Sequence, residues 1–111
     1  MSKLSYSVLA LTRAISGEVE AHRFVGTDNA RAGAGANVLG VNQHYANDED
    51  SAVDMLGIVP IESGAAVTAG SLIESDAEGR AIDQTAGAIV GRALESSTAA
   101  GQFVLCQLIP N

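Results

Sequence analysis

Residues 64–109 read GAAVTAGSLIESDAEGRAIDQTAGAIVGRALESSTAAGQFVLCQLI, a series of short apolar segments separated by turn residues. Gly70 permits the positive φ of a tight turn just before the apolar pair at 72–73. Residues 76–79 (DAEG) have the composition of a hairpin loop, in which Asp starts the turn and Gly ends it. Most of the segments have the length of strands and not of helices. The stretch therefore predicts a β meander around which the rest of the chain is organised.

The same pattern extends through the remainder of the chain. Residues 18–27 are predicted as one strand with an exposed face, and residues 51–61 as a long strand broken at Gly57 and ended near Pro60. The Ala-rich residues 85–100 are compatible with a helix, but two glycines, each costing about 1 kcal/mol relative to Ala, favour strand. A short helical turn suits residues 65–69. Other strands are predicted at 38–42, 80–82, 88–94 and 102–109, and loops at 28–35 and 43–50.

The predicted elements indicate a mainly β fold in a single domain, the expectation for 111 residues. Residues 16–111 form this predicted β domain. Residues 1–15 are predicted as an N-terminal arm or an edge strand, and both interpretations fit the sequence. In this segment Leu4, Tyr6 and Val8 alternate along one face, and Leu9 and Leu11 then shift the register.

Charge and composition exclude several classes of function. The net charge is −7, with six basic and 13 acidic residues, and the basic residues do not cluster. Binding to nucleic acid or to an anionic membrane surface needs a basic face, so both are disfavoured. No apolar run approaches the roughly 18 residues of a membrane span, and no signal peptide is recognisable. With one Cys no internal disulfide can form, so a soluble protein made in a reducing compartment is expected.

No motif predicts a catalytic, cofactor or metal site. Cys106 lies in an apolar run and is interpreted as a small buried hydrophobe. The glycine-rich residues 33–40 do not match a dinucleotide fingerprint, and the acidic residues 48–50 lack the spacing of a calcium loop. His22 and His44 lie in separate segments with no neighbouring ligand, so a zinc site is disfavoured. The sequence thus predicts neither an enzyme nor a cofactor.

Several motifs taken together resemble the small capsid decoration (cement) proteins of tailed phages, of the small prophage head-decoration type. They are AHRFV (21–25), GANVLGV (35–41), GAAVTAG (64–70), DAEGRA (76–81), and GRALE (91–95) with the AG at 100–101. The resemblance implies a compact β-barrel, β-tulip or β-clip-like domain with at most one or two short helical turns, similar to lambda-type head decoration proteins. It also implies a homotrimer on the outer capsid surface of the virion. There it would bind the major capsid protein lattice and stabilise the shell against internal DNA pressure, after synthesis in the bacterial host cytoplasm.

The N-terminal segment is the candidate contact surface under this interpretation. We hypothesise that it pairs with the capsid or with a neighbouring subunit by β-augmentation; the alternative is an ordinary strand of the protein's own sheet. The residues assigned to this contact are Leu4, Tyr6, Val8, Leu9 and Leu11. Two other functions compete: a β-rich surface-binding module that recognises a host or a glycan, and, less favoured, a small β-clip enzyme. Four scattered aromatic residues argue against a carbohydrate-stacking platform.

Overall fold

A computed structural model describes residues 5–111, which form ten strands and no helix. This confirms the predicted mainly β fold class, while the finer likeness to a β-tulip stays a prediction. No element of the described part of the chain is a helix that could cross a membrane. The strands are β1 (Tyr6–Ala14), β2 (Glu18–Val19), β3 (Phe24–Gly26), β4 (Val38–Asn42), β5 (Ala46–Asn47), β6 (Asp50–Glu62), β7 (Leu72–Ser75), β8 (Ala81–Asp83), β9 (Gly91–Ala93) and β10 (Phe103–Leu108).

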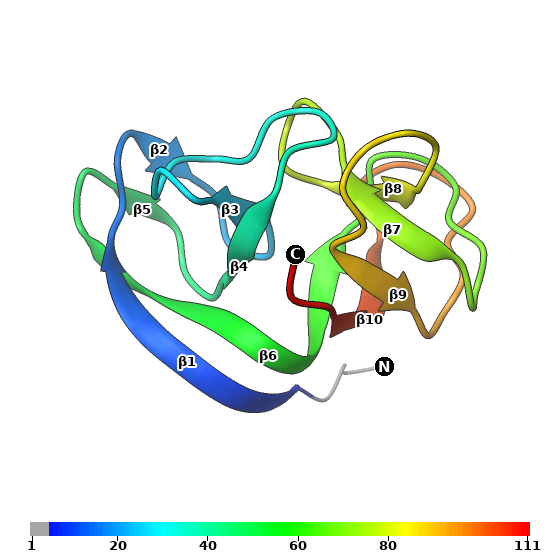
Figure 1. Cartoon of the computed structure of the whole chain (residues 1–111), viewed down its shortest axis with the longest axis horizontal. Coiled ribbons are helices and arrows are strands. Elements are labelled where there is room, and N and C mark those ends of the chain that lie inside the picture. The colour runs from blue at the N-terminus through cyan, green and yellow to red at the C-terminus, as the bar shows by residue number, and fades with distance from the viewer. Residues whose placement is uncertain (1–4) are drawn as a thin grey trace.

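Eight strands form one antiparallel sheet that curls into a nearly closed barrel (Figure 1). Along the sheet the order is β3-β4-β6-β10-β9-β7-β8, and β1 pairs with β6 outside this path. The two ends of the sheet approach each other where the N–H of Phe24 in β3 donates to the carbonyl of Gly79, in the loop between β7 and β8, at 2.7 Å. Strands β2 and β5 form a separate two-stranded sheet.

Strand β6 is the longest strand and pairs with three others. Residues 50–58 pair with β1, Val53 and Asp54 pair with β4, and residues 58–62 pair with β10. The long strand predicted at 51–61 is confirmed and ends at Glu62, two residues beyond Pro60, but the expected break at Gly57 is wrong because β6 runs through it. Within residues 5–111 the pairing with β1 reaches no further than Ile58, so at Pro60 the described structure pairs β6 with β10 alone, and a Pro is tolerated there.

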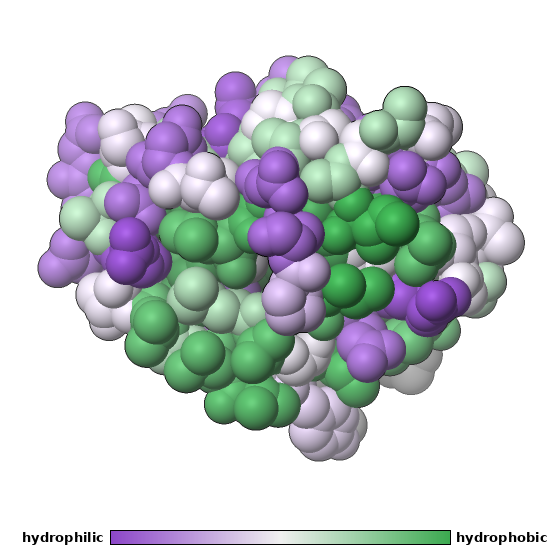
Figure 2. Space-filling view, viewed as in Figure 1, coloured by the Kyte–Doolittle hydropathy of each residue, from purple (hydrophilic) through white to green (hydrophobic). Residues whose placement is uncertain are grey.

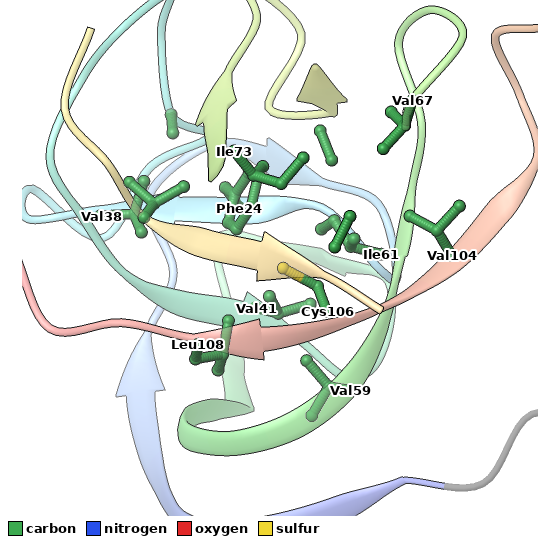
Figure 3. Packing of buried hydrophobic residues seen from close by; sticks show 14 residues of the cluster. Phe24, Val38, Val41, Val59, Ile61, Val67, Ile73, Val104, Cys106 and Leu108 are labelled. Atoms are coloured by element: carbon green, nitrogen blue, oxygen red, sulfur yellow. The ribbon is translucent and has the colours of Figure 1, made fainter. Parts of the chain in front are cut away.

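The core consists of two clusters of buried apolar side chains. The larger one fills the barrel with residues from β3, β4 and β6 to β10, and includes Phe24, Ile61, Ile73 and Val104 (Figure 3). A smaller cluster lies where β6 begins, around Val19, Val25 and Val53. Because most of these side chains are Val or Ala, each contributes little area, and the sheet must curl tightly to exclude water from them.

The predicted strand at residues 18–27 is wrong, because the chain turns sharply in its middle. His22 adopts φ 63°, and β2 and β3 lie on either side of it. The turn cancels the predicted alternation, so that Phe24 and Val25 are both fully buried. His22 is held there by backbone bonds: its N–H donates to the Asn42 carbonyl, and its own carbonyl accepts from Glu62.

Two further local predictions are corrected in the second half of the chain. Residues 65–69 form no helical turn, because Val67 instead exchanges backbone hydrogen bonds with Ser97 at 2.9 and 3.1 Å. The strand predicted at 88–94 shrinks to Gly91–Ala93. Gly91 is needed there, since a Cβ at this position would lie 2.5 Å from the Cys106 sulfur. The close approach of β9 and β10 therefore depends on a glycine.

Candidate functional site

Strand β1 is exposed along almost its whole length. Eight of its nine residues are exposed and the remaining one, Arg13, is half-buried. Among the described residues β1 pairs with β6 only, which leaves its other edge without a strand (Figure 1). Such an edge presents a row of backbone donors and acceptors to any incoming chain. Of the two interpretations of this segment, residues 6–14 form an edge strand.

Four of the five residues assigned to the contact are exposed apolar side chains of β1. Their exposed fractions are 78% for Val8, 60% for Tyr6, 44% for Leu11 and 40% for Leu9. Leu4 lies outside the described residues. Large apolar side chains on an edge strand usually face a core, so this concentration on one strand points to a binding surface.

These side chains border two hollows between β1 and its neighbours. Tyr6 and Val8 border one hollow, and Leu9 borders the other. Sequence reasoning missed the residues that complete them, because the run 51–61 was interpreted as one strand with no assigned surface role. We name this surface the β1–β6 ribbon. It comprises Tyr6, Val8, Leu9 and Leu11 of β1 together with Met55, Leu56, Gly57 and Ile58 of β6.

A bulge lets β1 present apolar side chains to both hollows. The pairing register shifts between Ser7 and Leu9 and again between Leu9 and Ala10. Gly57 lies opposite this bulge at φ 121°, and a Cβ there would be 2.2 Å from the carbonyl oxygen of Tyr6. Only glycine fits both constraints, so the twist of the ribbon is built into the sequence.

The ribbon is apolar, and the acidic residues lie elsewhere. Figure 2 shows hydrophobic residues along the lower side, where β1 and β6 run, and hydrophilic residues over β2 and β5. The acidic tip at residues 48–50 belongs to that hydrophilic end, as does the hydrogen bond from the Tyr45 hydroxyl to Glu18 at 2.6 Å. That bond and the Glu18 charge raise the pKa of Tyr45. The two kinds of surface are therefore separated on the molecule.

The reactive side chains of the described region do not gather into a metal centre. Cys106 is fully buried, which confirms its interpretation as a small core residue, and burial raises its pKa to about 12. No group of three His, Cys, Asp or Glu side chains among residues 5–111 is placed to hold a metal ion. The structure does bring His22 and His44 to one polar hollow, although they are 22 residues apart in sequence. No local pattern signals that proximity.

Comparison with known proteins agrees with this geometry. A model of the phage cement protein family matches residues 5–108. The chain belongs to the phage cement protein family. This is a family of phage structural proteins and not of enzymes. A search of curated proteins found no match.

The fold of this phage cement protein also occurs in a solved structure. It is similar to the N base of the head fiber protein gp8.5 of bacteriophage phi29, with a TM-score of 0.74. The alignment covers 91% of this chain and 93% of that chain at 17% sequence identity. At this identity the likeness shows a shared fold.

Proposed function

We propose that this cement protein binds the outer surface of the assembled phage head and stabilises the shell against internal DNA pressure. The observation that carries the proposal is the β1–β6 ribbon, an open strand edge with apolar side chains, in a chain of the cement family. The partner is the major capsid protein lattice, and the protein belongs to the virion after synthesis in the host cytoplasm.

Contact through the ribbon combines two kinds of interaction. Backbone groups at the free edge of β1 pair with a strand of the partner, and the side chains of Tyr6, Val8, Leu9 and Leu11 are buried. Burying an exposed Leu or Val completely is worth about 1.5–3 kcal/mol, and these side chains are roughly half exposed, so each adds about 1 kcal/mol. Such modest contacts become strong when many copies bridge one lattice.

Stabilisation follows from mass action. A ligand that binds the assembled lattice and not its dissociated subunits shifts the equilibrium towards the lattice. No reacting group is needed for this role. We also propose that the protein acts as a homotrimer, which multiplies the contacts each particle makes with the shell.

Co-sedimentation with purified heads tests the proposal. Leu11→Asp on β1 should abolish sedimentation with heads, because it places a charge in the buried contact. Leu94→Asp is the matched control, since Leu94 is 43% exposed against 44% for Leu11 and follows β9 on another part of the barrel. Undiminished binding of the Leu11→Asp protein, or of a protein lacking residues 2–12, would refute the role of the ribbon. The mass of the free protein by analytical ultracentrifugation tests the trimer.

A further inference from the structure

A polar hollow lies beside the start of β1, apart from the apolar ribbon. Its volume is about 240 Å³, below the roughly 300–1,000 Å³ of sites for drug-sized ligands, so it suits a group the size of a side-chain terminus. The turn between β2 and β3, the loop after β4, and β6 all contribute to its wall. The lining residues are Ser5, His22, Gln43, His44, Asp54 and Pro60.

Asp54 gives this hollow its chemical character. It lies in β6 between its partners Val41 of β4 and Ala10 of β1, and only 4% of its surface is exposed. One carboxylate oxygen accepts a hydrogen bond from the Gln43 amide at 2.6 Å. Within residues 5–111 no Arg or His forms an ion pair with it. A carboxylate offers about four acceptor sites, and a buried one without a counter-ion is costly.

His22 is a lining residue of the hollow whose position is fixed by its neighbours. Its φ of 63° lies in the left-handed region, which is uncommon for residues other than Gly, although Asn, Asp and His adopt it more often than the rest. The backbone is held by hydrogen bonds to Asn42 and from Glu62, at 2.8 and 2.9 Å. The imidazole packs edge-on against Phe103, with ring centroids 5.2 Å apart and an interplanar angle of 71°. Strained backbone held in this way is found preferentially at ligand sites.

We propose that this hollow binds a cationic nitrogen group, a guanidinium or an ammonium, with Asp54 as its counter-ion. The cation would pair with the Asp54 carboxylate, which has no ion-pair partner within residues 5–111, and a carboxylate accepts two parallel N–H bonds from a guanidinium. The flat guanidinium also stacks on a ring such as that of His22. Gln43 and His44 offer further acceptors at the rim. The inference is independent of the proposed capsid role.

Titration of ¹⁵N-labelled protein by NMR tests this site. The probe is n-butylguanidinium chloride, and n-butylurea is its neutral planar isostere. We expect saturable shifts of the amide signals of Gln43, His44 and Asp54 with a dissociation constant of about 1–10 mM, typical of a fragment of this size. The urea should produce no saturable shift. Equal shifts with both compounds, or none with the cation, would overturn the proposal, and this comparison needs no variant.

Two variants locate the charge that matters. Asp54→Asn should weaken n-butylguanidinium binding at least tenfold, because Asn keeps the shape of the Asp54 side chain but lacks its negative charge. Asp50→Asn is the control, since Asp50 lies on the same strand but is exposed, and it should bind as the wild type does. Retained binding in the Asp54→Asn protein would show that the hollow is not the site.

The source of the cation is resolved by a second pair of probes. Binding of n-butylammonium as tight as that of spermidine assigns the hollow to a single basic side chain of a protein partner. Spermidine binding at least tenfold tighter assigns it to a free polyamine. Failure of both to bind, together with n-butylguanidinium, would contradict the proposal and would leave head binding through the ribbon to its own sedimentation test.

Discussion

Glu74 should be a major determinant of stability, and its replacement by Ala tests how the loop after β8 is held. The residue lies in β7 and is 6% exposed. One carboxylate oxygen, Oε1, accepts the backbone N–H groups of Thr85, Ala86 and Gly87 at 2.5, 3.2 and 3.3 Å. It also accepts the Thr85 hydroxyl at 2.9 Å. A single side chain thus fixes three consecutive residues of a segment without regular structure.

The size of the stability loss in Glu74→Ala depends on which of the four donors can bond to water once the carboxylate is removed. Each hydrogen bond to a charged group is worth about 1.5–3 kcal/mol, so four such bonds would sum to about 6–12 kcal/mol, which is comparable to the whole stability of a small domain. Thr85 and Ala86 are exposed and will be rehydrated, whereas Gly87 is half-buried. We therefore expect Glu74→Ala to lower the free energy of unfolding by roughly 2–4 kcal/mol. Glu74→Gln keeps an acceptor oxygen and should cost about half as much.

Acid should weaken this interaction selectively. The backbone N–H and then the hydroxyl of Thr85 lower the pKa of Glu74 below its ordinary value of 4.5, against an opposing effect of burial. A lowered pKa means that the contribution is complete above about pH 4.5 and is lost as pH falls through the folded-state value. The free energy of unfolding in urea, measured from pH 7 to pH 3, should therefore fall less steeply for Glu74→Gln than for the wild type.

A surface control separates this effect from general acid denaturation. Glu78 is exposed, and its ion pair with Arg31 at 3.4 Å should contribute little. Glu78→Gln should therefore reproduce the wild-type stability at pH 7 and its slope below pH 5. If the free energy of unfolding of Glu74→Gln equals that of the wild type at pH 7 and at pH 3, the hydrogen-bonded carboxylate is not what holds residues 85–87.

Three other changes have defined outcomes. Gly57→Ala should free the first residues of β1 while the barrel stays folded, seen as at least tenfold faster amide hydrogen exchange confined to β1; exchange as slow as in the wild type would contradict the geometry. Gly87→Ala places a Cβ 2.4 Å from the Gly35 Cα and should lower the free energy of unfolding in urea by about 1–3 kcal/mol, and an unchanged urea midpoint would refute this. Cys106, with a pKa of about 12, should react with a thiol reagent only after denaturation, and rapid labelling of the native protein would show that it is accessible.

The sequence predicts the strands wherever local signals agree. The strand at 38–42 is found at its predicted bounds, because a short apolar run with two Val residues lies between a Gly-rich loop and a polar loop. The turn at His22 carries no such signal, since neither Gly nor Asn marks its positive φ. It is imposed by the hydrogen bond that the His22 N–H donates to the Asn42 carbonyl and by the one that its carbonyl accepts from Glu62, and both partners are distant in sequence. Tertiary contacts therefore override the alternation that predicted one continuous strand.

The candidate surface could be predicted only in part, because local signals mark its apolar residues but tertiary contacts decide their exposure. Alternation in β1 identifies Tyr6 and Val8 as apolar residues near the terminus, but it cannot say that both faces of the strand remain exposed. That depends on how β1 pairs with β6, which includes the β1 bulge opposite Gly57. The polar hollow was not predictable, because His22, His44 and Asp54 meet only through the curvature of the sheet.

An open apolar strand edge would ordinarily promote association of copies with one another. Natural proteins block such edges with Lys, Pro or a covering loop, and β1 carries one cation, Arg13, near its far end. The net charge of −7 instead acts on the whole molecule, and repulsion between copies opposes their random stacking. That repulsion is weaker towards a partner whose net charge is less negative, and it is absent towards a partner of opposite charge. An acidic body whose proposed contact side chains, Tyr6, Val8, Leu9 and Leu11, are uncharged can therefore favour a foreign lattice over disordered self-association.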